Sequence, residues 1–348
     1  MNPYVTATFL MSLGLGTTIT FASSHWLLAW MGLEINTLAI LPLMAQKHHP
    51  RAVEATTKYF LTQATAAALL LFSATLNAWT TGEWTIQQPF NQILLTTTVL
   101  ALTLKLGMAP MHFWLPEVLQ GLDLTTGLIL STWQKLAPMV LLYQLPLENN
   151  QSMMVLIGLA SALIGGWGGL NQTQLRKILA YSSIAHMGWM MVVLAFFPNL
   201  MLLNLAIYII MTYTAFTTLK KSSATKINTL ATTWAKAPIL ATVNMITMLS
   251  LGGLPPLTGF MPKWLILKEL AEQDLPIVAT LMALSALLSL FFYLRVCYTM
   301  TLTLSPNTNN MKTPWRLKST QITLPLSVAS TMTAMLLPAT PAIVAMMM

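Results

Sequence analysis

The chain has 348 residues, of which 55% are hydrophobic and only 7% charged, and its formal net charge is +8. Soluble domains carry roughly 25% charged residues, so this composition excludes a soluble globular protein and indicates a polytopic membrane protein. A single cysteine, Cys297, excludes an internal disulfide and an iron–sulfur cluster held by this chain alone, and no glycine-rich nucleotide loop is present.

Long apolar runs without charged residues indicate membrane-spanning helices, because they lack the two-residue alternation of a barrel wall. The start of the chain has neither a basic segment ahead of a cleavage site nor an Arg/Ser-rich transit segment, so we expect the first run to be retained. An all-α fold with about eleven transmembrane helices is predicted. These spans are expected near 3–22, 25–45, 55–79, 91–120, 125–145, 151–170, 174–196, 200–220, 238–271, 275–303 and 322–344.

The charges in the loops support this count, because basic residues gather on the side that faces the cytoplasm or matrix. Loops on the N-terminal side carry eleven bases, whereas the opposite side has only Lys268 among several acids. The N-terminus is therefore expected on the matrix side and the C-terminus on the other, and the positive charge needs no nucleic-acid partner. The eleven bases are Lys47, Arg51, Arg176, Lys177, Lys220, Lys221, Lys226, Lys236, Lys312, Arg316 and Lys318, and the opposing acids are Glu83, Glu148, Glu269, Glu272 and Asp274.

Two predicted spans are too long for one helix and contain helix breakers at their centres, around 107–116 and around 253–262. Paired interrupted helices in corresponding halves of a membrane chain indicate a transporter-type internal repeat. Each half would contain five helices, an odd number, so we expect inverted repeats over about 1–147 and 150–303, with one extra helix over about 322–344. The breakers correspond at a constant offset of 146 residues: Gly107, Pro110 and Pro116 match Gly253, Pro256 and Pro262.

Four ionisable residues lie inside these apolar stretches, where each charge costs roughly 2.5–3.5 kcal/mol on insertion scales. They are Glu34, Lys105, Lys135 and Lys263. Lys135 lies about 18 Å from either end of its span at 1.5 Å per residue, too far for its ammonium to reach the headgroups, so we expect it to face a polar cavity. Intramembrane charges of this kind indicate a path for protons or ions.

Glu34 is expected to pair with an embedded lysine, first of all Lys105, because a buried carboxylate without a cationic partner stays protonated. Lys105 precedes the first break, near a half-helix C-terminus whose dipole stabilises a cation, whereas Lys263 opens a half-helix, where the dipole disfavours one. An alternative for both lysines is that they only satisfy carbonyls freed by the breaks.

Two histidines suit a proton relay because the ordinary pKa of histidine is near neutrality. His112 lies inside the first break and His186 near the middle of the seventh predicted span. The alternative is a structural hydrogen bond to a facing helix. No spacing of His, Cys and carboxylates indicates a metal site.

Five segments resemble the chain 2 family of NADH:ubiquinone oxidoreductase, or respiratory complex I, of the vertebrate mitochondrial type. They are the run from Trp30 to Asn36, the run from Lys105 to Glu117, Trp133 to Pro138, Ala180 to Gly188 and Gly252 to Trp264. The resemblance covers essentially the whole length, although animal members lack the first helices of the bacterial ones.

The resemblance implies a single antiporter-like membrane domain, 1–348, in the membrane arm of complex I, where quinone reduction elsewhere drives proton movement. It places Glu34 at the family's acid, Lys105 and Lys263 at the lysines of the two broken helices, Lys135 at the bridging lysine, and His112 and His186 at relay positions. No cofactor is implied in this chain, and FMN, iron–sulfur clusters and ubiquinone are expected on partner subunits. Expected partners are chains 4 and 4L, accessory subunits and phospholipids such as cardiolipin, in the mitochondrial inner membrane.

Two alternatives belong to other functional classes. A free-standing cation/proton antiporter would need no redox partners, and co-migration with flavin and iron–sulfur subunits would reject it. A structural spacer would transmit conformational change without carrying protons, and it would lose nothing on neutralisation of Lys135.

Overall fold

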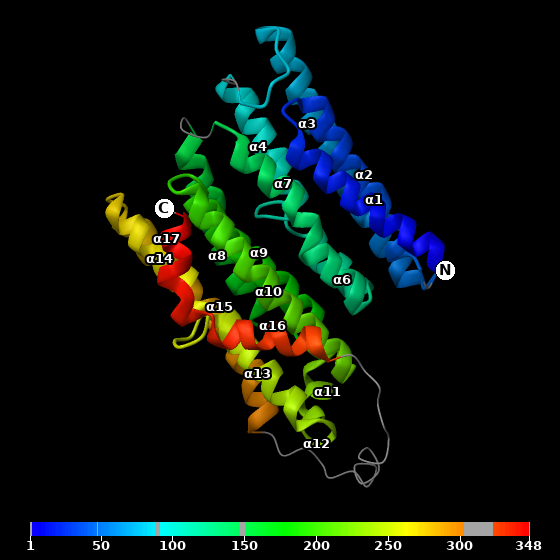
Figure 1. Ribbon diagram of the computed structural model, residues 1–348, viewed down its shortest axis with the longest axis vertical. Coiled ribbons are helices and arrows are strands. Elements are labelled where there is room, and N and C mark those ends of the chain that lie inside the picture. Colours follow the sequence, from blue (N-terminus) through cyan, green and yellow to red (C-terminus); the bar gives the residue numbers. More distant parts are fainter. Residues whose placement is uncertain (1, 47, 88–90, 147–149, 303–322, 348) are drawn as a thin grey trace. The chain divides into compact units, whose positions relative to one another are not determined.

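The computed structural model describes residues 2–46, 48–87, 91–146, 150–302 and 323–347, and helices make up most of these ranges (Figure 1). The described segments contain no β-strand beyond two isolated β-bridges. The predicted all-α, polytopic fold is therefore confirmed. Some charged residues used in the sidedness prediction lie outside the described residues: Lys47, Glu148, Lys312, Arg316 and Lys318.

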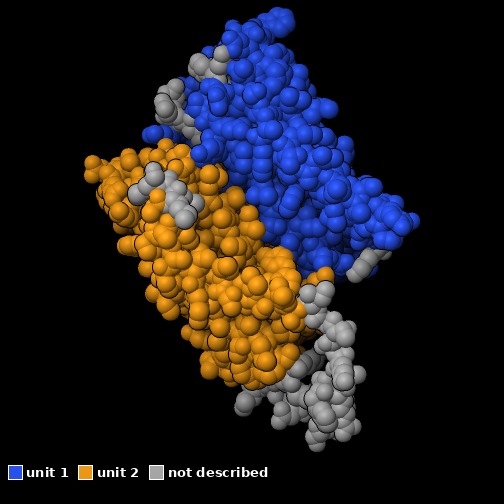
Figure 2. Space-filling model, viewed as in Figure 1, with its two compact units in different colours: residues 1–161 blue, residues 162–348 orange. Residues whose placement is uncertain are grey.

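The chain divides into two compact units, Met1–Ser161 and Ala162–Met348, which Figure 2 shows in blue and orange. In the first unit α1, α2 and α3 pack in sequence, α3 packs on α4 and α5, and α7 contacts α1, α2 and α4. Its helices are α1 (Pro3–Ala22), α2 (Trp26–Met44), α3 (Pro50–Thr81), α4 (Gln92–Leu106), α5 (Trp114–Gly121), α6 (Leu124–Ser131) and α7 (Trp133–Gln144). Helix α8 (Gln151–Gly169) contains the boundary between the units.

The second unit is organised around α9, whose side chains are almost all buried. Helix α10 packs against α9, α13 and α16, and α15 packs against α13 and α14. The helices of this unit are α9 (Leu175–Leu194), α10 (Pro198–Ser222), α11 (Ile227–Ala231), α12 (Thr233–Lys236), α13 (Pro238–Gly252), α14 (Phe260–Glu272), α15 (Pro276–Thr301), α16 (Leu324–Met335), the 3₁₀-helix η4 (Leu337–Ala339) and α17 (Thr340–Met347).

The predicted spans correspond to helices of the structure, but not always to one helix each. Among the described residues, seven helices are long and apolar enough to cross a membrane, and the bent pair at the C-terminal end adds an eighth. The two predicted breaks separate α4 from α5 and α13 from α14. Two further interruptions were not predicted, one at Thr132 between α6 and α7 and one of 65° after α16.

Both predicted breaks begin in the same way. Gly107 and Gly253 adopt the left-handed backbone region, with φ of +74° and +80°, and each amide donates to a carbonyl of the last turn of the preceding helix. Glycine favours this conformation because it has no Cβ, and it ends a helix while satisfying free carbonyls. The peptide bonds before Pro110 and Pro256 are both cis. The constant sequence offset thus corresponds to the same local backbone in the two units.

A close contact between α1 and α2 fixes the segment that contains Glu34. A Cβ atom on Gly16 would lie 2.4 Å from the side-chain oxygen of Asn36, and one on Gly32 would lie 2.8 Å from the Gly16 carbonyl oxygen. Small residues allow membrane helices to approach in this way. The two glycines therefore hold the middle of α2 directly against α1.

Candidate functional site

Glu34 and Lys105 form an ion pair inside the first unit, as the sequence predicts. The Lys105 Nζ lies 3.9 Å from the Glu34 Oε1, and the side chains are 3% and 24% exposed, respectively. The hydroxyl of Thr37 donates both to the Glu34 main-chain carbonyl and to Glu34 Oε2, at 2.9 and 3.3 Å. The expected pairing is confirmed, and the Thr37 hydroxyl holds the carboxylate that faces Lys105.

The end of α4 explains why a lysine is tolerated here. Lys105 lies in the last turn of α4, where the helix dipole stabilises a cation. The indole Nε1 of Trp114 donates to the Leu104 carbonyl at 3.2 Å and thereby satisfies one of the carbonyls that the break leaves free. The ammonium of Lys105 is consequently not needed to satisfy the helix end, and it faces Glu34.

Both buried lysines of the first unit, Lys105 and Lys135, line a cavity of about 20 Å³. A volume of this size holds about one water molecule. Gln134 and Lys135 lie in the first turn of α7, directly after the interruption at Thr132, and both line this cavity. Its remaining polar lining is Asn36, Thr37, Tyr59, Gln63 and Gln134. Lys135, 4% exposed, therefore faces a polar cavity as predicted.

One hydrogen bond ties the walls of the cavity together. The side-chain Nε2 of Gln134 donates to the main-chain carbonyl of Asn36 at 3.2 Å, which links α7 to α2. Asn36 lies two residues beyond Glu34, so the cavity wall and the ion pair share one helix turn. A displacement of either helix would change both.

Lys263 in the second unit takes a different arrangement. Its Nζ donates to the Gly252 carbonyl at 2.7 Å, and its chain passes against Gly253. The expectation that the helix dipole disfavours this cation is wrong, because the side chain points back from α14 and places the ammonium at the C-terminal end of α13. This hydrogen bond is the one that the alternative interpretation, a lysine satisfying a freed carbonyl, requires.

The two histidines are buried, one in each unit. The ring of His112 lies in the first break with Nδ1 3.2 Å from the Pro110 carbonyl oxygen. Because a carbonyl only accepts, Nδ1 carries the hydrogen, and Nε2 is the acceptor of a neutral ring. His112 does not line the cavity between the two lysines. His186 packs on Tyr208 in the second unit, with ring centroids 5.5 Å apart.

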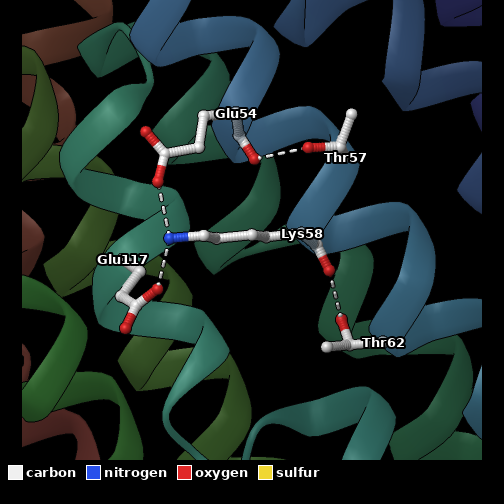
Figure 3. A network of polar contacts seen from close by, with 5 residues as sticks. All are labelled: Glu54, Thr57, Lys58, Thr62 and Glu117. Atoms are coloured by element: carbon white, nitrogen blue, oxygen red, sulfur yellow. Dashed lines mark hydrogen bonds and ion pairs between the residues drawn. The ribbon is translucent and has the colours of Figure 1, made fainter.

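An ionic cluster joins α3 to α5 beside the first break (Figure 3). The Lys58 ammonium lies 2.7 Å from Glu54 Oε1 and 2.8 Å from Glu117 Oε2, and the carboxylates approach it from two sides. All three side chains are between 42% and 62% exposed, so the attraction is screened more than that of the Glu34–Lys105 pair. The i,i+4 spacing of Glu54 and Lys58 signals half of this cluster in the sequence.

Comparison with known proteins gives the family of this chain. A family model described as NADH:quinone oxidoreductase/Mrp antiporter, TM, matches residues 23–289, and one described as NADH dehydrogenase subunit 2 C-terminus matches residues 290–344. The NADH-ubiquinone oxidoreductase chain 2 of Carassius auratus is 68% identical over 343 residues, 99% of each chain. This chain belongs to the NADH-ubiquinone oxidoreductase chain 2 family. The resemblance seen in its motifs is confirmed.

Solved structures agree with the chain 2 assignment. A chain of respiratory complex I from Thermus thermophilus is similar with a TM-score of 0.85 and 27% identity, over 97% of this chain and 79% of that one. A chain of the Mrp complex from Dietzia sp. DQ12-45-1b has a TM-score of 0.84 at 16% identity, over 96% and 75% of the two chains, which shows a common fold.

The structure adds three polar residues to the site of this chain 2 family member that sequence reasoning did not single out. Tyr59 and Gln63 lie one turn apart on α3 and line the cavity together with Gln134. Their spacing of four residues, which places both on one face of α3, is the signal that could have identified Tyr59 and Gln63. Among the described residues, no group of three or more His, Cys, Asp or Glu side chains could hold a metal ion.

Proposed function

We propose that this chain translocates protons as an antiporter-like subunit of NADH:ubiquinone oxidoreductase, with Glu34, Lys105 and Lys135 carrying the proton through the first unit. The observation that carries the proposal is the Glu34–Lys105 ion pair, 3.9 Å long, beside a cavity that Lys135 also lines. Membership of the chain 2 family supports the reaction as a whole.

The ion pair acts as an electrostatic switch in this proposal. At an effective dielectric constant of about 20, two unit charges 4 Å apart attract by roughly 4 kcal/mol. A closed pair therefore stabilises the charged form of Lys105, and opening it withdraws that stabilisation. The proton of Lys105 then leaves through the cavity toward Lys135. The energy that opens the pair comes from quinone reduction in other subunits.

The second unit contains further candidates in the same proposal. His186 is buried on the central helix α9, and Lys263 lies at the second break, so both are candidates for later proton transfer. His112, in the first break, is a candidate for the first unit. The common backbone at Gly107 and Gly253 and the matching prolines, Pro110 with Pro256 and Pro116 with Pro262, support two inverted repeats, about 1–147 and 150–303, with an extra helix over about 322–344.

The proposal also includes the setting of the subunit. We place it in the mitochondrial inner membrane, with the N-terminus and the basic loops in the matrix and the C-terminus in the intermembrane space. FMN, iron–sulfur clusters and ubiquinone are assigned to partner subunits. Chains 4 and 4L are proposed as neighbours, together with accessory subunits and phospholipids such as cardiolipin.

Replacement of Lys135 by methionine tests the proposal in the assembled complex. Methionine keeps the length of the side chain and removes the charge. We expect the number of protons moved per electron in vesicles to fall, while Lys268→Met, at a side chain 58% exposed, leaves it unchanged. An unchanged ratio in Lys135→Met would instead identify the subunit as a spacer that carries no protons.

A further inference from the structure

Three polar side chains around the cavity have buried groups that make no hydrogen bond to a protein atom. They are the Nε2 of Gln63, the Nζ of Lys105 and both polar atoms of the Asn36 amide. The residues are 4%, 7% and 2% exposed, respectively. A buried donor without a partner destabilises a folded protein, so several around one cavity indicate a ligand for them.

The cavity limits the ligand to something very small. Its volume of about 20 Å³ excludes an organic molecule and a hydrated ion, whereas a water needs about 10–15 Å³ and two to four polar partners. Lys105, Gln63 and Asn36 meet that requirement from α4, α3 and α2.

We infer that Gln63 is a positioning residue that holds one water in this cavity, as the proton carrier between Lys105 and Lys135. This inference rests on the proposed function. The Lys105 ammonium and the Gln63 amide both donate, so they occupy the two lone pairs of the water. Its two O–H bonds must then point away from Lys105 and Gln63, which aims them at the rest of the cavity wall, where Lys135 lies.

The proton transfer from Lys105 to Lys135 conserves atoms and charge. An N–H bond of the Lys105 ammonium breaks as the water oxygen takes that proton. One of the original O–H bonds of the water breaks as the neutral amine of Lys135 takes a proton. Lys105 ends neutral, Lys135 ends as the ammonium, and the water is restored with one of its hydrogens exchanged. Gln63 neither gains nor loses a proton, because its role is to fix the orientation of the water.

The surroundings of Gln63 favour it for this role over its neighbours. It lies one turn after Tyr59 on the cavity face of α3, and Asn36 has its side-chain oxygen against Gly16 of α1. The Gln134 amide already donates to the Asn36 carbonyl. Of the two glutamines on the cavity wall, Gln63 is thus the one whose Nε2 is buried and has no protein acceptor.

Two substitutions at Gln63 separate a water-positioning role from a packing role. Gln63→Leu keeps the volume and removes the polar group, whereas Gln63→Ala opens space in which a second water replaces the amide. If Gln63 positions water, translocation per assembled complex in proteoliposomes falls on the order of tenfold in Gln63→Leu, as for a loss of about 1.4 kcal/mol in the transition state, and falls less in Gln63→Ala. A packing role predicts the opposite order, since the alanine leaves a void.

A matched control and two further results complete the test. Asn77→Leu removes another buried amide of α3, which does not line the cavity, and should leave translocation unchanged. Normal pumping by Gln63→Leu, or an equal loss in Gln63→Ala, overturns the inference. If Lys135→Met loses pumping while Gln63→Leu does not, the role of Gln63 is refuted and the proposed function stands. If Lys135→Met pumps normally, the proposed function itself is refuted.

If Gln63→Leu does not assemble, the wild-type complex decides the question. A map that resolves waters elsewhere in this subunit should show density within hydrogen-bond distance of both Gln63 Nε2 and Lys105 Nζ. A map of that quality with no density between these atoms overturns the inference.

Discussion

Replacement of Glu34 by glutamine removes one charge from the proposed switch and leaves its shape. The glutamine carbonyl can still accept the hydrogen bond that Thr37 donates to Glu34 at 3.3 Å. What disappears is the attraction to Lys105 across 3.9 Å, roughly 4 kcal/mol at an effective dielectric constant of about 20. Since each 1.4 kcal/mol is a factor of ten, the balance between charged and neutral Lys105 shifts on the order of a thousandfold.

We expect the initial rate of proton translocation by Glu34→Gln complex in proteoliposomes, per amount of assembled complex, to fall at least about tenfold. Glu83→Gln, at an exposed loop position, is the control for neutralising an acid. A wild-type rate for Glu34→Gln, or an equal loss in the control, would refute the switch.

The double variant Glu34→Gln/Lys105→Met separates folding from pumping. Alone, Glu34→Gln leaves the Lys105 side chain buried at 3% exposure without its counter-ion, and an unpaired buried charge costs about 3–5 kcal/mol. We therefore expect less assembled complex on native gels for the single variant and recovery of the assembled amount in the double variant. Translocation should stay low in both. Recovery of translocation together with assembly would show that the pair serves stability alone.

Two further substitutions test the breaks. Lys263→Met leaves the buried Gly252 carbonyl without its donor, so we expect the amount of assembled complex to fall by the equivalent of about 1–3 kcal/mol. Lys263→Arg keeps a donor and should restore assembly. If the lysine also exchanges protons, Lys263→Arg should not restore pumping. Gly107→Ala places a Cβ on a residue with φ of +74°, 2.7 Å from Leu115 Cδ1, so the amount of assembled complex should decrease by the equivalent of about 1–2 kcal/mol. Gly14→Ala is the control, because a Cβ there meets nothing within 4 Å, and it should not change assembly.

The fold could largely be predicted from the sequence because its signals are local. Apolar runs predict helices, and glycine followed by prolines predicts the breaks that Gly107 and Gly253 begin. The interruption at Thr132 carries no such breaker, since the nearest proline, Pro138, lies inside α7. No local sequence pattern therefore marks it.

The site could be predicted as a set of charges but not as a geometry. The cost of burying Glu34 and Lys105 separately was enough to predict that they pair. The direction of Lys263 was not predictable from its place at the start of a helix, because a flexible side chain reaches the preceding helix end. Gln63 is uncharged, so no cost of burying a charge marks it in the sequence, although it lines the same cavity as Lys135.

The contact of Gly16 with Asn36 extends the site to a helix that carries no titratable group except Tyr4 near its start. Asn36 is part of the cavity wall, and its main-chain carbonyl accepts a hydrogen bond from the Gln134 amide. Helix α1 packs against Asn36 and therefore supports this wall of the cavity. An inherited substitution of Gly16 by a larger residue would displace Asn36 and with it this wall of the cavity. Distance in sequence from every acid and base is therefore a poor guide to whether a variant in this subunit is harmless.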